Sequence, residues 1–286
     1  MKERSETDMN APVKSRSKEQ GEYIRLCDKL NIVDLFVSLQ GEGKYVGVPS
    51  LFIRVSGCNL RCCFKDSICD TAYSSFKPEK GKFNKDDVVA MLRENPCVTD
   101  IVITGGEPLM FGEALDDLIE YICMINEMDY RITVETNGTF GPLKSIINLY
   151  SISPKLRTAV PVAGKPYTYV HDGRTVVKTF SNDEVEHYNI TRRNTEAIAA
   201  LMDQADFQLK FVYSGPESLT DIDNLLEEIM DVSCGFDPED VMLMPEGITP
   251  EQLDRNAQEA AEICIKRGWR FTDRLHIRLW GDKRGK

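Results

Sequence analysis

Residues 56–71 read SGCNLRCCFKDSICDT and contain four of the nine cysteines of the chain, Cys58, Cys62, Cys63 and Cys69. The run LFIRV directly before them has the β-branched and aromatic composition of a buried strand. Four thiols this close together could form a disulfide staple, bind zinc or bind an iron–sulfur cluster. The loop therefore poses a question about chemistry and, because it follows a strand, also about the fold.

Similar short β-rich runs recur along the chain and end in glycine, proline, asparagine or charged residues. Helical patterns separate several of them, for instance EALDDLIEYICMINEM (113–128) and SLTDIDNLLEEIMDV (218–232). Such alternation predicts parallel βα units. The runs that we expect to be strands are 51–55, 100–104, 131–135, 149–153, 207–213, 240–244 and 270–280.

Most of these runs lead into a conspicuous polar or glycine-rich stretch. The stretches are SGCNLRC, GGEP, TNGT, PK, PEG and GDKRG. In βα architectures, sites are built at the carboxyl ends of the strands. Loops contain glycine, proline and polar residues for other reasons too, but six such stretches together with a cysteine cluster favour a functional site on this face.

The composition restricts the class of protein. The chain has 286 residues, 42% of them hydrophobic, which suffices for one large domain such as an α/β barrel. A net charge of −11 argues against direct nucleic-acid binding. The chain has neither an apolar run that could span a membrane nor the apolar segment of a secretory signal. We therefore expect a cytoplasmic protein, in which thiols stay reduced, and this weakens the disulfide interpretation.

The chain divides into two parts on its sequence pattern. Residues 1–28 are charged, serine-rich and aperiodic, and we expect a disordered leader. Residues 29–286 form the folded domain, with a less regular insertion at about 156–206.

The spacing of the clustered cysteines bears on the metal they could bind. Zinc sites usually take their ligands as two separated pairs, whereas Cys62 and Cys63 are adjacent and cannot easily point at one metal. Cys58, Cys62 and Cys69 remain as three spaced thiols. On a four-iron cluster, three thiolates would leave one iron open to another ligand; structural zinc is the alternative. The remaining cysteines are expected to be small core residues: Cys27, Cys97, Cys123, Cys234 and Cys264.

The stretch ITGGEPL (103–109) follows the cysteine loop by one βα unit. Gly105 and Gly106 allow the backbone to approach a ligand closely, and Glu107 can accept hydrogen bonds from an ammonium group. With these two motifs the chain resembles the radical S-adenosylmethionine (SAM) enzymes. There, three cysteines hold a [4Fe–4S] cluster whose open iron binds the amino and carboxylate groups of SAM.

Further motifs make the resemblance more specific. SLQGEGKYVGVPSLFIRVSGCNL, CDT, TGGEP, ETNGT, SPK and LWGDKRG are similar to the 7-carboxy-7-deazaguanine synthase family over most of the chain from about Val33. The match thins over 156–206 and is absent from the leader. The resemblance implies an incomplete (β/α) TIM-like barrel of the radical SAM type.

The family resemblance also implies a reaction. The substrate would be 6-carboxy-5,6,7,8-tetrahydropterin and the products 7-carboxy-7-deazaguanine and ammonia, in the biosynthesis of queuosine and other 7-deazaguanines. The reduced cluster would cleave SAM to a 5′-deoxyadenosyl radical, and Mg²⁺ would assist. A homodimer is expected, with an electron donor such as flavodoxin or ferredoxin.

The resemblance assigns roles to individual residues. The cluster ligands would be Cys58, Cys62 and Cys69, and Thr71 would bind Mg²⁺. The residues expected to line the SAM site are Gly105, Gly106, Glu107, Glu135, Ser153 and Lys155. Those expected to bind the pterin are Leu39, Gln40, Gly41, Glu42, Arg54 and Thr104, with the arginine fork placed for the substrate carboxylate.

The cysteine loop departs from the usual CxxxCxxC spacing of the family. The third cysteine would fall at Lys65, whereas Cys69 precedes Asp70 and Thr71 as in the CDT of the family, after a four-residue expansion. Whether Cys63 binds the cluster stays open. Two other functions are also open: a glycyl-radical-activating radical SAM enzyme, and a catalytically silent binding or regulatory protein of the same fold.

Overall fold

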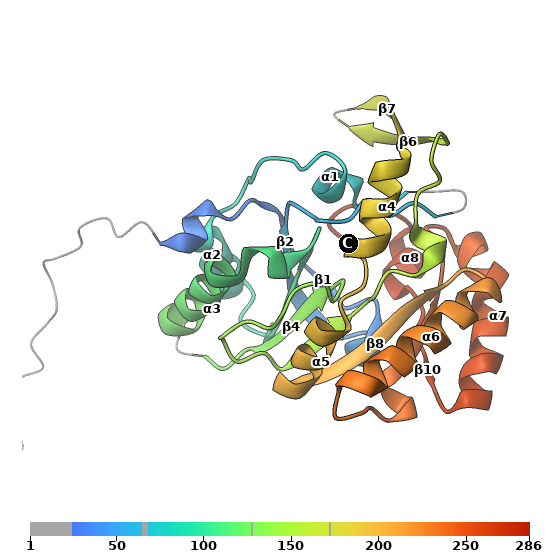
Figure 1. Ribbon diagram of the computed structural model, residues 1–286. Coiled ribbons are helices and arrows are strands. Elements are labelled where there is room, and N and C mark those ends of the chain that lie inside the picture. Colours follow the sequence, from blue (N-terminus) through green and yellow to red (C-terminus); the bar gives the residue numbers. More distant parts are fainter. Residues whose placement is uncertain (1–24, 65–67, 127, 172) are drawn as a thin grey trace, which may run out of the picture.

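An eight-stranded sheet forms the centre of the computed structural model, which describes residues 25–64, 68–126, 128–171 and 173–286 (Figure 1). Only β1 runs antiparallel to its neighbour, and all other pairings are parallel. In sheet order the strands are β1 (Ile32–Leu39), β2 (Pro49–Val55), β3 (Asp100–Gly105), β4 (Arg131–Thr136), β5 (Leu149–Ile152), β8 (Asp206–Tyr213), β9 (Val241–Pro245) and β10 (Arg270–Phe271).

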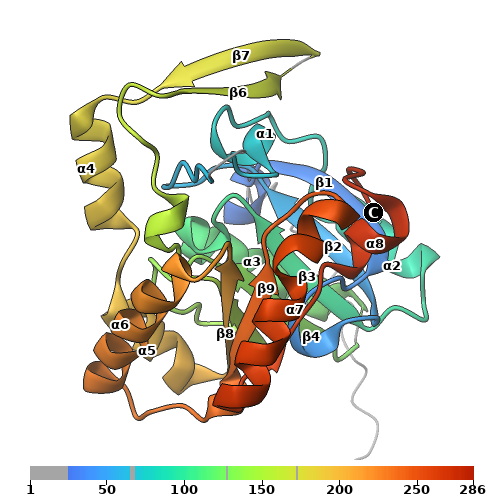
Figure 2. The ribbon, with the colours of Figure 1, turned by 90° about the vertical axis from the view of Figure 1, so that its right-hand side faces the viewer.

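Helices connect most of the parallel strands and lie outside the sheet (Figures 1 and 2), whereas β4 and β5 are joined by a segment without a helix. Within the described residues, β1 and β10 do not pair with each other, so the barrel is incomplete. This confirms the predicted fold class and most of the predicted strands. The helices are α1 (Ala72–Ser75), α2 (Lys85–Glu94), α3 (Gly112–Asn126), α4 (Asn182–Thr191), α5 (Thr195–Gln204), α6 (Glu217–Val232), α7 (Pro250–Arg267) and α8 (Leu275–Trp280).

Helix α3 shows how the apolar pattern builds the core. Leu115, Leu118, Ile119 and Ile122 recur at helical spacing and are buried against the sheet. A stripe of this width on one face is what holds a helix on a sheet. The predicted helix at 113–128 is therefore confirmed, and so is the predicted helix at 218–232, which is α6.

The predicted strand at 270–280 is wrong for most of its length. Only Arg270 and Phe271 form a strand, and residues 275–280 form helix α8. Leu275, Ile277 and Leu279 alternate as in a strand, but Ile277 is 2% exposed and Leu279 51%. In the described part of the chain β10 is the edge of the sheet, and the segment after it forms a helix that buries Ile277.

The folded domain includes the end of the stretch predicted as a leader. A 3₁₀ helix spans Leu26–Lys29, and its residue Cys27 is buried. Arg25 pairs with Asp117 of α3 at 2.8 Å. The prediction for residues 1–24 lies outside the described part of the chain.

The insertion predicted at about 156–206 contains two different parts. Strands β6 (Pro166–His171) and β7 (Arg174–Thr179) form a separate antiparallel hairpin that projects beside α1 and α4 (Figures 1 and 2). Helix α5, by contrast, buries Ile198 and Leu201 in the main core. The irregular part is therefore the hairpin with α4, and α5 is a regular barrel helix.

Asp221 of α6 fastens this insertion to the barrel. Its carboxylate accepts a hydrogen bond from the Arg157 backbone N–H at 2.7 Å and forms ion pairs with Arg192 at 3.3 Å and Arg193 at 3.0 Å. Arg192 and Asp221 are each 4% exposed. A buried charge pair with this many partners holds its segments in one arrangement.

All nine cysteines lie in the described residues and are free thiols. Cys27 and Cys264 are buried as predicted for core cysteines and Cys123 is half-buried, but Cys97 and Cys234 are exposed. Their expected core position is therefore wrong. None of the described helices is long and apolar enough to cross a membrane.

Candidate functional site

A cavity of about 1190 Å³ opens at the carboxyl ends of the parallel strands. Its walls come from the loops after the strands, from the cysteine loop and from the last residues of the chain. Of the residues predicted for the site, Glu107 does not line this cavity. The others do: Leu39, Gln40, Gly41, Glu42, Arg54, Cys58, Cys62, Cys69, Thr71, Thr104, Gly105, Gly106, Glu135, Ser153 and Lys155.

Three cysteines of the loop that line the cavity are Cys58, Cys62 and Cys69. Burial, and then the neighbouring Cys62, raises the pKa of Cys58 to about 12. Burial raises the pKa of Cys62 to about 11, against the opposing charge of Lys155. Such thiols keep their protons until a metal replaces them. Three neighbouring thiols facing a cavity form a donor set that fits an iron–sulfur cluster with one open iron.

The alternative of a structural zinc site gains no support from the geometry. Among the described residues, nowhere do three or more His, Cys, Asp or Glu side chains gather as they would around a single metal ion. A structural zinc needs four such ligands within about 2.3 Å of one point. The thiolates that hold a cluster bind different irons and need not converge in this way.

Cys63 has the surroundings of a core residue, although it also borders the cavity. It is 1% exposed and packs with Tyr167 and Phe180. Its thiol lies 3.7 Å from the Arg61 carbonyl oxygen, and its backbone forms an isolated bridge with Ile68. These contacts account for Cys63 without a metal.

The GGE loop lies against the cysteine loop, backbone to backbone. The Glu107 N–H donates to the Gly57 carbonyl oxygen at 2.8 Å. A Cβ on Gly106 would stand 2.1 Å from that same oxygen, and a Cβ on Gly105, whose φ is +151°, would stand 2.1 Å from the Val55 carbonyl oxygen. Only glycine fits such a contact, so the two glycines set the distance between the cysteine loop and strand β3.

The Glu107 carboxylate is turned toward the end of β4. It is fully buried and accepts hydrogen bonds from Thr136 Oγ1 at 2.7 Å, the Asn137 N–H at 2.6 Å and the Leu109 N–H at 3.0 Å. Burial raises its pKa, and these hydrogen bonds oppose the shift. In the described structure this carboxylate holds the TNGT loop and does not line the cavity.

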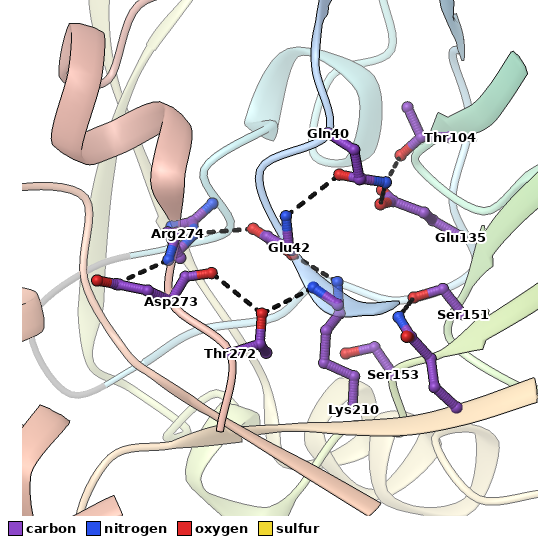
Figure 3. A network of polar contacts seen from close by, with 12 residues as sticks. Gln40, Glu42, Thr104, Glu135, Ser151, Ser153, Lys210, Thr272, Asp273 and Arg274 are labelled. Carbon is purple, nitrogen blue, oxygen red and sulfur yellow. Dashed lines mark hydrogen bonds and ion pairs between the residues drawn. The ribbon is translucent and has the colours of Figure 1, made fainter. Parts of the chain in front are cut away.

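Glu135 joins three strands on the cavity wall (Figure 3). It accepts hydrogen bonds from Gln40 Nε2 at 3.2 Å and from Thr104 Oγ1 at 2.9 Å. Gln40 Oε1 in turn accepts from the Glu42 N–H at 3.3 Å. The network fixes the orientation of the Gln40 amide and presents donors and acceptors along one side of the cavity.

A second network surrounds Glu42 (Figure 3). Lys210 of β8 binds one of its carboxylate oxygens, and Arg274 Nε lies 2.9 Å from the other. Arg274 also binds Asp70 and the Gly247 carbonyl oxygen. Burial alone would raise the pKa of Glu42, but the charges of Lys210 and Arg274 hold it well below its usual value. Glu42 is therefore ionised, and its ion pairs fix the orientation of its carboxylate.

Arg54 and the last residues of the chain meet at Asp34. Arg54 Nε lies 3.3 Å from the Asp34 carboxylate, outside hydrogen-bonding geometry. Arg284 binds Asp34 at 2.7 Å and Glu79 at 3.0 Å, and its guanidinium stacks 3.7 Å above the Tyr73 ring. The carboxyl-terminal segment, residues 281–286, is thereby fastened over the cavity as a latch.

The latch should open when Arg284 is replaced. Arg284→Met removes two ion pairs and the ring contact of a side chain that is 36% exposed, so we expect a loss of ~1 kcal/mol. Backbone hydrogen exchange over 281–286 should then be about fivefold faster by mass spectrometry. Lys283→Met, which removes a positive charge from the same segment without an ion pair, should leave exchange unchanged. Equal rates in all three proteins would contradict the latch.

Lys155, from the predicted SAM group, contacts its neighbour in the SPK stretch. Its ammonium donates to the Ser153 carbonyl oxygen at 2.8 Å and to Ser153 Oγ at 3.0 Å. Its charge also acts on the Cys62 thiol. The positive charge after β5 therefore lies between the cysteine loop and the rest of the cavity.

Several cavity residues were missed by the sequence analysis: Asp70, Lys210, Arg274 and His276. A parallel strand that is buried on both faces usually reads as a continuous apolar run. FQLKFVY breaks that rule at alternate positions, and Gln208 and Lys210 are 2% and 4% exposed. Two polar residues on the same face of such a strand indicate that this face is not part of the apolar core. From this pattern Lys210 could have been predicted at the site. Arg274 and His276 carried no such signal, because their segment was assigned to a strand.

Comparisons with known proteins identify relatives of this chain. Residues 39–165 match the family described as a 4Fe-4S single cluster domain. The 7-carboxy-7-deazaguanine synthase of Halobacterium salinarum is 38% identical over 254 residues, which cover 88% of this chain and 91% of that one. The enzyme of the same name from Rhodopirellula baltica is 33% identical over 263 residues, 90% of this chain and 88% of the relative.

A solved structure supports the fold. The crystal structure of QueE from Escherichia coli superposes with a TM-score of 0.53 at 22% identity, covering 86% of this chain and 93% of that one. With the cysteine loop, the GGE loop and near full-length relatives all in agreement, the chain belongs to the 7-carboxy-7-deazaguanine synthase family of radical SAM enzymes.

Proposed function

We propose that this protein converts 6-carboxy-5,6,7,8-tetrahydropterin into 7-carboxy-7-deazaguanine and ammonia. The observation that carries the proposal is the single cavity that joins the cysteine loop to the LQGEG loop in a chain of this family. The reaction is a ring contraction in which the substrate loses one nitrogen as ammonia, and no other atom leaves.

The cofactor end of the cavity fits a [4Fe–4S] cluster and SAM. Cys58, Cys62 and Cys69 would hold the cluster. Bound there, the cluster and SAM supply a carbon radical that removes a hydrogen atom from the substrate. Residues suited to hold SAM are Gly105, Gly106, Glu135, Ser153 and Lys155, while the buried Glu107 shapes the adjoining loop. The Lys155 ammonium suits a carboxylate.

The other end of the cavity fits a flat, hydrogen-bonding ring. Gln40 and the fixed carboxylate of Glu42 match the amide and amine edge of a pterin. The backbone of Leu39 and Gly41 lies beside them, and Thr104 joins Gln40 through Glu135. Such an edge needs matched partners, because an unpaired buried polar group costs about 1–3 kcal/mol. The Arg54 guanidinium lines the same cavity and suits the substrate carboxylate.

Two requirements come from outside the chain. The cluster needs one electron from a donor such as flavodoxin or ferredoxin, and Mg²⁺ takes oxygen ligands and keeps several waters. Thr71 offers a hydroxyl oxygen on the cavity wall for this ion. We also expect a homodimer, which sedimentation would establish.

The experiment is turnover of the reconstituted protein. Iron and sulfide are added without oxygen, followed by SAM, Mg²⁺, a reductant and the carboxytetrahydropterin. We expect the deazapurine by mass, one ammonia per product, and no product without SAM. Cluster binding and SAM cleavage without any deazapurine would instead point to an enzyme acting on another substrate, such as a glycyl-radical protein. Failure to cleave SAM would point to a binding or regulatory protein.

The role of Thr71 has its own test. Thr71→Ala should raise the Mg²⁺ concentration needed for half-maximal turnover by about tenfold or more, because one oxygen ligand is lost. Thr71→Ser keeps the oxygen and should behave like the wild type. An unchanged Mg²⁺ dependence in the alanine variant would remove Thr71 from the ion site.

A further inference from the structure

The hydroxyl of Tyr188 points at one of the proposed cluster ligands. It donates a hydrogen bond to Cys62 Sγ at an O–S distance of 3.2 Å. Tyr188 is 4% exposed and Cys62 is 5% exposed, and both belong to one small apolar cluster with Leu60 and Ala159. The bond therefore forms away from water, where hydrogen bonds are strongest.

Tyr188 reaches this position because helix α4 is fixed at both ends. At its N-terminus, Ser181 and Glu184 form a capping box. At its C-terminus, Arg192 donates to the Lys155 carbonyl oxygen at 2.7 Å and forms the buried ion pair with Asp221 at 3.3 Å. The part of the insertion that carries Tyr188 is thus held against the loop after β5, which itself lines the cavity.

Each of the three thiols has a hydrogen-bonding neighbour, and these neighbours differ. Cys58 Sγ accepts from the Leu60 N–H at 3.4 Å, within its own loop. Cys69 Sγ lies 3.3 Å from Thr71 Oγ1, which is two residues away. Among the described residues, the Cys62 neighbour alone comes from a distant part of the chain, 126 residues on. A substitution at Tyr188 can therefore remove a donor without altering the cysteine loop itself.

We propose that Tyr188 is a positioning residue that tunes the reduction potential of the iron–sulfur cluster through its hydrogen bond to Cys62. This inference rests on the proposed function, because it takes Cys62 as a ligand. A thiolate cannot donate, so the phenol must be the donor. Hydrogen bonds to the sulfurs are among the factors that set cluster potentials. They stabilise the reduced state, which carries more negative charge, and so make the cluster easier to reduce.

The test is a redox titration of the reconstituted protein, followed by the electron paramagnetic resonance of the reduced cluster. Tyr188→Phe keeps the ring and removes the donor, so its midpoint potential should be more negative than that of the wild type. Tyr121→Phe is the matched control, because the Tyr121 hydroxyl binds Asp86 on the outer surface. Its potential should equal that of the wild type.

A second substitution should shift the midpoint potential in the opposite direction, which a poorly folded variant would not do. Tyr188→3-fluorotyrosine keeps the hydroxyl and makes it a stronger donor, so the potential should become less negative. Electron–nuclear double resonance should also show an exchangeable proton coupling in the wild type that is missing in Tyr188→Phe.

The outcomes separate this inference from the proposed function. Equal potentials in the wild type, Tyr188→Phe and the fluorotyrosine protein, with SAM cleavage intact, would overturn the inference alone. A wild-type protein that binds no cluster would overturn both.

Discussion

Cys69→Ala is expected to leave the protein without a [4Fe–4S] cluster and without detectable product. The thiol is one of the three proposed cluster ligands that line the cavity. Without it, two of the four irons would lack a protein ligand, and the cluster would be held by two thiolates only. Iron and sulfide content, the visible absorption of the cluster and product mass would measure the loss. Cys58→Ala and Cys62→Ala should behave in the same way.

Cys63→Ala is the matched control for this experiment. Cys63 packs with Tyr167 and Phe180, so its replacement removes apolar contacts and should cost about 1 kcal/mol of stability. Iron content and turnover should be close to those of the wild type. The reverse pattern, with iron kept in Cys69→Ala and lost in Cys63→Ala, would show that the expanded spacing of the loop had been assigned to the wrong cysteine.

Glu42→Gln is expected to lower both stability and turnover. The substitution leaves Lys210, which is 4% exposed, without its charge partner, and removal of one member of a buried pair costs about 3–5 kcal/mol. In the proposed substrate complex the amide would also lose a charged hydrogen bond, worth about 1.5–3 kcal/mol. We therefore expect kcat/KM to fall by at least about tenfold. Urea unfolding and steady-state kinetics measure the two effects.

A double substitution separates these two effects. Glu42→Gln with Lys210→Met removes both charges and should recover most of the lost stability, since a buried pair replaced by neutral groups is often close to neutral. Turnover should not recover, because the substrate still lacks its carboxylate partner. Recovery of turnover together with stability would show that Glu42 has only a structural role.

The position of the site was predictable from the order of the chain. LFIRV, DIVIT and RITVE are β-rich runs, and the residues directly after each of them line one cavity, because parallel strands bring their carboxyl ends to one edge. The same reasoning identified the two glycines of the GGE loop. Local pattern was sufficient here because each residue lies within a few positions of a strand end.

The contacts that depend on distant packing were not predictable. Tyr188 is one tyrosine on a short helix whose apolar side is weakly marked, and nothing near it in sequence indicates Cys62. From the sequence, the Glu107 carboxylate fits either a ligand or the interior. The outcome depends on Thr136 and Asn137, which lie at the end of the next strand and directly after it. Arg274 was hidden because the apolar alternation after it suggested a strand.

The docking of the last residues over the cavity has a practical consequence for handling the protein. Lys286 borders the cavity, and the side chain of Arg284 forms ion pairs with Asp34 and Glu79. A bulky label attached to Lys286 would therefore lie beside the cavity and load the contacts that Arg284 makes. Catalytic constants measured on protein labelled at this position should be compared with those of the unlabelled protein.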